Sequence, residues 1–173
     1  NRKYKKFHLD FVADCKIGKA ATDIYFILEH KSYADKLVLL QILNYCSVLW
    51  EENIRNNERL KPVVPVIFYH GRARLNLPER FVDYFEVDEF LKGYLVDFGY
   101  VFVDTSSYSD EEIAEKDYNN LYFAASLLTL KHIFSELDKL RPALSYASRL
   151  DRDRLLFILE YIASSRDVEK GEL

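Results

Sequence analysis

The chain has 173 residues, of which 49% are apolar and 15% aromatic, and this composition predicts a folded domain rather than a disordered segment. Its formal net charge of −4 argues against a protein that coats nucleic acid through a basic surface, although it is compatible with an acidic site that binds cations. No apolar run approaches the ~18 residues of a membrane span, so no membrane partner is expected. The two cysteines, Cys15 and Cys46, are few and far apart, which favours a reducing, cytoplasmic compartment.

Two strands and a turn are predicted at the start of the chain. Residues 7–17 are rich in β-branched and aromatic residues, and Gly18 after them can take the positive φ of a tight turn. Residues 22–31 form the return strand. Its run from Ile24 to Leu28 is apolar without a break, which is typical of a strand covered on both faces and therefore central in its sheet. The two strands are expected to pair as a β-hairpin.

A helix over about residues 35–53 is predicted next, because no proline or glycine interrupts this segment and apolar residues recur at helical spacing. Those apolar residues are Leu37, Leu40, Ile42, Leu43, Val48 and Leu49. Residues 63–71 form a third strand. Pro65 cannot donate a hydrogen bond to a neighbouring strand, so it is expected at a sheet edge or near the start of its strand.

The rest of the chain is predicted to be irregular, then extended, then helical. Residues 72–93 suit short helical or irregular pieces, and residues 94–106 form a fourth strand by their alternation and aromatic content. Ser109 and Glu112 match a capping box, so a helix should begin there.

This helical region should run to about residue 140, with a break near Asp117, and Pro142 marks its end. Residues 151–164 carry apolar residues on one face and form a last helix. Strands in the first two thirds, helices in the last third and one helix between strands predict an α/β or α+β fold in a single domain.

The second strand ends in charged residues that a half-buried strand does not need. Side chains alternate between the two faces of a strand, so Glu29 and Lys31 should share one face and His30 should lie on the other. If the hairpin pairs as predicted, Asp10 on the neighbouring strand can meet Glu29 and Lys31. Two adjacent carboxylates repel unless a cation lies between them, and Mg²⁺ takes one or two carboxylates and several waters. A lysine beside the metal could orient the attacking water or stabilise charge on a phosphoryl group, which suggests phosphodiester hydrolysis.

Gln41 and Tyr45 lie one helical turn apart and therefore share a face of the predicted helix. Because this helix starts just after Lys31, it should pack back over the hairpin. The two side chains could then hold the lysine, a water molecule or a backbone phosphate.

Asp10, the Glu29-x-Lys31 pair and the Gln41-x-x-x-Tyr45 pair together resemble the PD-(D/E)xK nuclease superfamily with its RecB-type helix. More narrowly, the strings DIYFILEHKSY, LQILNY and PVVPVIFYHG resemble the bacterial recombination-promoting nuclease family, whose members are also called putative transposases. The three strings in this order are much more specific than the charged residues alone.

The resemblance is strongest over residues 7–71 and implies a restriction-endonuclease-like core, which is a central mixed β-sheet flanked by helices, with a helical C-terminal third. One nuclease domain is expected over residues 1–173. Its core would cover about residues 7–106, and C-terminal helices at about 109–165 would pack on it. Family members also tend to have a helical element before the first strand, with an acidic residue near the site, and we expect this chain to lack that element.

For the site, the resemblance implies Mg²⁺-dependent endonucleolytic cleavage of DNA that promotes recombination, with Mn²⁺ as a substitute metal. Asp10 and Glu29 would be the metal ligands, Lys31 the catalytic lysine, and Gln41 and Tyr45 supporting residues. DNA is the expected partner, and a homodimer is compatible with the sequence. The chain departs from the superfamily motif at its proline, because the residue before Asp10 is a leucine.

Four alternatives stay open. The charged residues could be only a salt-bridged cluster at a sheet end, worth ~0–1 kcal/mol where such pairs are exposed. The chain could be a catalytically inactive module of the same fold that binds DNA or a protein partner. It could be a transposase proper, although strand transfer usually uses three carboxylates. A metal site made of His8, His30 and His70 is opposed by the strand alternation, which turns His30 away from Glu29.

Overall fold

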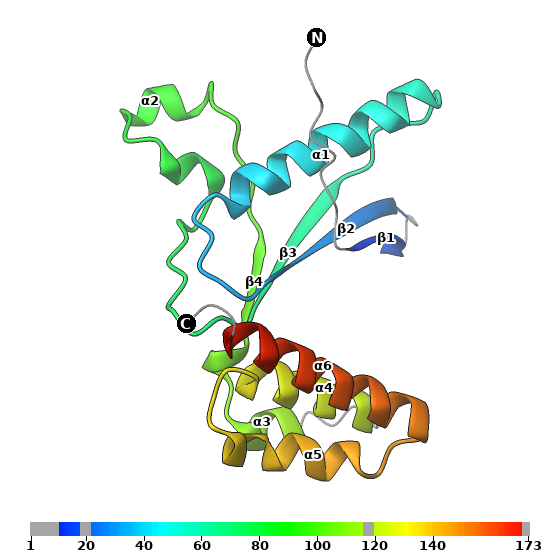
Figure 1. The fold of residues 1–173 in the computed structure, drawn as a ribbon. Helices are drawn as coiled ribbons and strands as arrows, with labels where there is room; N and C mark the ends of the chain where they lie inside the picture. Colours follow the sequence, from blue (N-terminus) through cyan, green and yellow to red (C-terminus); the bar gives the residue numbers. More distant parts are fainter. Residues whose placement is uncertain (1–10, 18–21, 116–119, 171–173) are drawn as a thin grey trace. The chain divides into compact units, whose positions relative to one another are not determined.

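The chain divides into two compact units, residues 1–103 (unit 1) and 104–173 (unit 2). The computed structural model describes residues 11–17, 22–115 and 120–170. Unit 1 is built on a β-sheet and unit 2 on helices (Figure 1), which confirms the mixed α/β class. The single domain over the whole chain stays a prediction.

The sheet of unit 1 has four strands in the order β1–β2–β3–β4 (Figure 1). The strands are β1 (Phe11–Ile17), β2 (Thr22–Lys31), β3 (Val63–Tyr69) and β4 (Val101–Asp104). β1 pairs antiparallel with β2, with Phe11 opposite Leu28, which confirms the predicted hairpin. β3 pairs parallel with β2, so the sheet is mixed and β2 lies between two strands, as its apolar run predicts.

α1 (Val38–Arg55) connects β2 to β3 and covers one face of the sheet (Figure 1). Parallel neighbours need a crossover of this kind, because a tight turn cannot return the chain to the same end of the sheet. Ile27 of β2 and Ile67 of β3 are fully buried against the helix. The inner face of α1 consists of Val38, Leu39, Ile42, Tyr45, Cys46 and Leu49. Pro65 is the third residue of β3, near the start of its strand as predicted.

The helix was predicted from apolar residues at helical spacing, but not all of these residues are buried. Leu37, Leu40 and Val48, which contribute to the predicted apolar spacing, are 63%, 44% and 42% exposed. The helix carries apolar residues around most of its circumference, so their spacing alone did not identify the side that faces the sheet.

Two short helical pieces lie between β3 and β4, as predicted. They are η1 (Phe81–Tyr84) and α2 (Glu89–Lys92). β4 is shorter than the predicted strand of residues 94–106. Tyr94 is 85% exposed, and the Phe98 carbonyl accepts a hydrogen bond from Phe81 N at 3.0 Å, outside the sheet. The aromatic pattern here instead serves ring stacking, since the Phe81 and Phe98 centroids lie 4.9 Å apart.

Unit 2 is helical. Of the two sequence features used to predict its helix ends, the capping box is confirmed and the predicted role of Pro142 was wrong. Its helices are η2 (Thr105–Ser107), α3 (Asp110–Glu115), α4 (Leu121–His132), η3 (Leu137–Leu140), α5 (Arg141–Ala147) and α6 (Arg152–Lys170). The capping box is confirmed, because Ser109 N donates to Glu112 Oε2 at 2.7 Å and Glu112 N donates to Ser109 Oγ at 3.0 Å. Pro142 does not stop the helical region. It lies in the first turn of α5, where a proline removes no helical hydrogen bond. Asp117, where a break was expected, lies outside the described residues.

α4 supplies residues to both buried clusters of unit 2. Its Leu128 packs with Ile113 of α3, and its Ala125 packs with Ala147 of α5 and Ile158 of α6. Throughout the described part of the chain, every helix is too short or too polar to span a bilayer.

Candidate functional site

β2 carries an acid and a base at its end on the face covered by α1. Glu29 and Lys31 are only 2% and 6% exposed, and Lys31 hydrogen-bonds to a side chain of α1. His30, between them, is exposed. Strand alternation therefore brings Glu29 and Lys31 to one face, as predicted.

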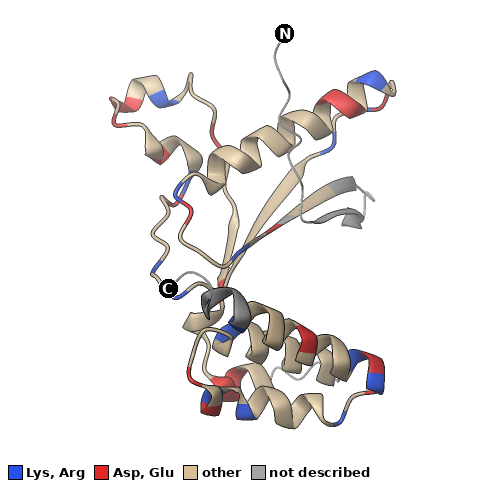
Figure 2. Cartoon of the chain, in the orientation of Figure 1, with Lys and Arg blue, Asp and Glu red and all other residues tan. Residues whose placement is uncertain are grey.

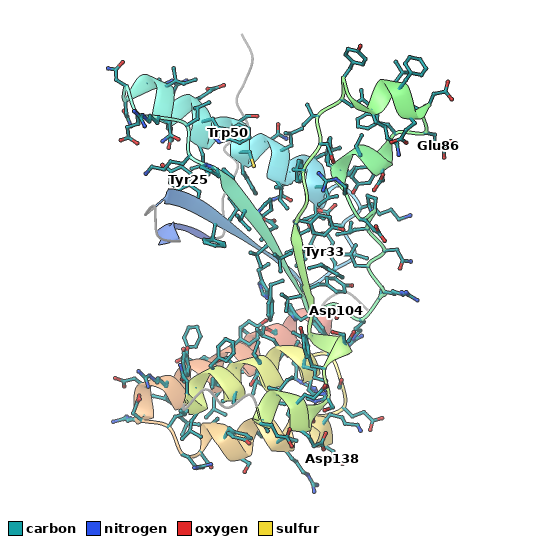
Figure 3. All side chains as sticks on the ribbon, turned by 180° about the vertical axis from the view of Figure 1, so that it is seen from behind. Tyr25, Tyr33, Trp50, Glu86, Asp104 and Asp138 are labelled. Atoms are coloured by element: carbon teal, nitrogen blue, oxygen red, sulfur yellow. The ribbon has the colours of Figure 1, made fainter. Side chains whose placement is uncertain are left out.

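The ammonium group of Lys31 is surrounded by three oxygen acceptors. Its Nζ lies 3.0 Å from Glu29 Oε1 and 3.1 Å from Asp35 Oδ2, and it donates to Gln41 Oε1 at 2.8 Å. An ammonium has three N–H donors, so these acceptors can use all of them. The ring of Tyr33, labelled in Figure 3, adds a cation–π contact with its centroid 5.5 Å from Nζ. These contacts hold Lys31 in one position.

Burial and hydrogen bonding act on the pKa of Lys31 in opposite directions. Burial favours the neutral amine and lowers the pKa, whereas the hydrogen bonds and negative charges of Glu29 and Asp35 together raise it above the ordinary lysine value. Lys31 is therefore a cation at neutral pH. It can donate hydrogen bonds and stabilise negative charge, but it cannot accept a proton as a general base.

Gln41 and Tyr45 connect Lys31 to the core. Gln41 accepts a hydrogen bond from Lys31 through Oε1 and donates one through Nε2 to the hydroxyl of Tyr45. Tyr45 is 1% exposed and belongs to the cluster between α1 and the sheet. Because packing fixes Tyr45, the Gln41 amide is held with its carbonyl toward Lys31. Of the three uses predicted for this pair, the geometry matches the one in which it holds the lysine.

Asp35 completes the cluster, although it was not among the site residues predicted from the sequence. Besides its contact with Lys31, Asp35 accepts a hydrogen bond from Leu37 N through Oδ1 at 2.9 Å, at the start of α1. A carboxylate is favourable there, because the first N–H groups of a helix lack partners within the helix. An aspartate just before a helix is the signal that could have located it.

Asp10 lies outside the described residues, so its place beside Glu29 stays a prediction. Phe11, the residue after Asp10, pairs with Leu28, the residue before Glu29. Among the residues whose placement is described, no group of three or more His, Cys, Asp or Glu side chains is arranged to hold a metal ion.

The described part of the chain includes only two of the three histidines in the alternative metal site. The rings of His30 and His70 stack with centroids 4.5 Å apart, but His30 is exposed and His70 is buried. His8 lies outside the described residues. A site made of all three histidines therefore stays an untested alternative.

The backbone after β3 closely approaches the backbone after β2. His70 N donates to the Lys31 carbonyl at 3.0 Å. A Cβ at Gly71 would lie 2.6 Å from the Ser32 carbonyl oxygen and would also meet the hydroxyl of Tyr69. Any residue other than glycine would therefore displace the segment that follows Lys31.

Two comparisons relate the chain to known proteins. Residues 1–154 match the family model described as "Putative transposase, YhgA-like". The chain is also 27% identical over 73 residues to "Recombination-promoting nuclease RpnD" of Escherichia coli O157:H7. This match covers 41% of the chain and 28% of that protein, so the matched segment spans less than a third of the relative's length. No solved structure matches the chain.

Proposed function

Because the chain belongs to the YhgA-like putative transposase family, we propose that it is a metal-dependent endonuclease that hydrolyses phosphodiester bonds in DNA and so promotes recombination. A nuclease-like role is also suggested by the name of its distant relative, a recombination-promoting nuclease. The observation that carries the proposal is the buried pair of Glu29 and Lys31 at the end of β2, which Gln41 orients.

The proposal includes a restriction-endonuclease-like core. The supporting observations are the mixed sheet, with β2 antiparallel to β1 and parallel to β3, and the cover that α1 forms over one face of it. This arrangement brings the charged end of β2 together with Gln41 and Tyr45 of α1.

The oxygen donors at the end of β2 suit a hard divalent cation. Glu29 contributes a buried carboxylate, and Asp10, the residue before Phe11, would contribute a second one. Mg²⁺ needs only one or two carboxylates because it keeps several water ligands, so this donor set fits it, and Mn²⁺ accepts the same ligands. A bound metal would supply Lewis acidity and lower the pKa of a coordinated water.

Lys31 would stabilise the negative charge that develops on the phosphoryl oxygens. It is cationic and already fixed, so little reorganisation is needed during the reaction. The proton of the attacking water must pass to solvent or to a group other than Lys31. Gln41 and Tyr45 would act as positioning residues, because they hold Lys31 through the hydrogen bonds described above.

Arg72 and Arg74 would bind the DNA backbone near the site. Both are exposed, and they follow β3, whose last residue, Tyr69, pairs with Lys31. Local arginines of this kind can hold phosphates even though the net charge of the chain is −4.

The direct test is nicking of supercoiled plasmid DNA by the purified chain with Mg²⁺ or Mn²⁺. Glu29→Gln and Lys31→Met should each lower the nicking rate by ~100-fold or more, because each removes a charge beside the reacting phosphate. Glu51→Gln and Lys92→Met are matched controls, since they remove the same charge types from surface ion pairs and should leave the rate unchanged. Circular dichroism establishes that each variant is folded.

Full-rate nicking by folded Glu29→Gln and Lys31→Met variants would refute these roles. Calorimetry separates the alternative of an inactive module, which would bind DNA or a protein partner without binding Mg²⁺ or Mn²⁺. DNA products that are joined as well as nicked would identify strand transfer.

A further inference from the structure

The outer face of α1 carries no charge from residue 38 to residue 50, although 30% of all residues in the chain are charged. Figure 2 shows the helix free of charged residues until its C-terminal end. The exposed residues of this face are Leu37, Leu40, Asn44, Ser47, Val48 and, just after the uncharged stretch, Glu51, whose charge is paired with Arg55 at 3.2 Å. A helix face in water usually carries charged residues, so this one has the character of a contact surface.

The two polar side chains on this face already have acceptors within the helix. Asn44 Nδ2 donates to the Leu40 carbonyl at 3.1 Å, and Ser47 Oγ donates to the Leu43 carbonyl at 3.0 Å. A partner could therefore cover both groups without leaving these donors unsatisfied. Removing this face from water costs less than removing a charged one.

The residues on the two sides of Asn44 complement each other. Leu40 and Val48 lie one turn before and one turn after Asn44, and both are exposed apolar residues. Lys36, in the turn before the helix, and Glu52 lie at equal distances farther out along the sequence, and both are exposed with opposite charges. If two identical helices run antiparallel around a two-fold axis at Asn44, Leu40 faces Val48 of the other copy and Lys36 comes to the same end as Glu52. The same axis places Leu37 against the side chain of Glu51.

We propose that the outer face of α1 binds the same face of a second copy of the chain, with the two-fold axis at Asn44. This match of a surface to itself favours a second copy, because a different partner would not require it. The small side chains of Asn44 and Ser47 at the axis would let the helix axes approach to ~8–10 Å. One helix face is smaller than the ~800 Å² that each partner buries in a standard interface, so we expect a dissociation constant of micromolar order.

Sedimentation equilibrium of the purified chain from about 1 to 100 μM tests the proposal. A monomer–dimer equilibrium is expected. Lys36→Glu alone and Glu52→Lys alone should each weaken the dimer ~10-fold, because each places like charges opposite one another, and the double variant should restore it. Phe157→Lys is the control, since Phe157 is 62% exposed on α6 and its replacement should not change the equilibrium.

Cysteine cross-linking tests the position of the axis. Asn44→Cys should form an intermolecular disulfide on mild oxidation, because the two thiols would face each other across the axis. Ile54→Cys, at a 63% exposed position near the end of the same helix, should not do so, and the unsubstituted chain gives the background.

A folded chain that stays monomeric at about 100 μM would overturn the proposal and leave the face to a different protein. A dimer whose dissociation constant is unchanged by Lys36→Glu and by Glu52→Lys would overturn it as well. Neither measurement depends on nuclease activity, so the dimer and the proposed function can fail separately.

Discussion

Both units contain a lysine beside a carboxylate, but the two clusters have different physical explanations. In unit 2, Lys131 Nζ and His132 Nε2 lie 2.5 Å and 2.8 Å from Asp110 Oδ1. Asp110 begins α3, and the two bases end α4. An acid at a helix N-terminus and bases at a C-terminus are each favoured by the helix dipole, so the helix ends account for this cluster. No helix end accounts for the pairing of Lys31 with Glu29 at the end of a strand.

The two lysines also differ in the contacts that hold them in place. Lys131 makes one more contact, with the Tyr108 carbonyl at 2.7 Å, and this contact ties two chain segments together. Lys31 is held by Gln41, which is itself held by Tyr45 in the core. A supporting layer of this kind is what a reactive group needs in order to keep a fixed orientation. The ion pair alone is therefore weak evidence for chemistry, and the supported pair is stronger evidence.

The largest expected difference between the two clusters is in the rate of plasmid nicking after the lysine is replaced. Lys31→Met is expected to slow plasmid nicking ~100-fold or more, whereas Lys131→Met should keep the rate within about twofold, because only Lys31 faces the proposed reacting phosphate. Initial rates are compared at equal concentrations of folded protein. If Lys131→Met were as inactive as Lys31→Met, the distinction between the clusters would be wrong.

The stability of unit 1 should show the next largest effect. Lys31→Met leaves the buried Glu29 without its cation and should cost about 3–5 kcal/mol. Adding Glu29→Gln should recover part of this loss, because the buried charge is then removed. Urea unfolding followed by the fluorescence of Trp50, the sole tryptophan (labelled in Figure 3), reports on unit 1. Destabilisation that is simply additive would show that the two side chains are not coupled.

The cluster in unit 2 should respond to pH. Burial raises the pKa of Asp110, but the hydrogen bonds from Lys131 and His132 outweigh it, so the pKa lies below its ordinary value of 3.8. A carboxylate with a lowered folded-state pKa stabilises the fold above the unfolded-state pKa, and this contribution is lost as the pH falls through the folded-state pKa. Asp110→Asn should therefore cost ~1 kcal/mol at neutral pH and nearly nothing in strong acid.

Thermal unfolding of Asp110→Asn and the unsubstituted chain, followed by circular dichroism at neutral pH and in strong acid, well below the ordinary pKa of 3.8, measures this difference. A gap in stability that is equal at both pH values would contradict the electrostatic account of the cluster.

The smallest effect is expected at the exposed pair of Glu51 and Arg55. Their side chains are 59% and 73% exposed and lie 3.2 Å apart, so Glu51→Gln should change stability by less than about 0.5 kcal/mol. The fluorescence of Trp50 measures this as well. A much larger loss of stability would contradict the exposure of this ion pair, because only a pair shielded from solvent contributes that much.

The parts of the site that lie on regular elements could be predicted from the sequence. Alternation along β2 brings Glu29 and Lys31 together, and the helical repeat does the same for Gln41 and Tyr45. Asp35 could not be predicted in this way, because the bend between it and Lys31 has no fixed period. The role of Pro142 was misjudged for a related reason, since a proline is compatible with both the end and the first turn of a helix.

The three acceptors around Lys31 also determine its reactivity toward covalent labels. The neutral amine of a lysine attacks acylating reagents, and the raised pKa and 6% exposure of Lys31 make that form both scarce and inaccessible. An exposed lysine such as Lys36 would react first. The extent of acylation at Lys31 would thus measure how often its contacts with Glu29, Asp35 and Gln41 open. Any ligand that displaces one of these acceptors would change the extent of acylation.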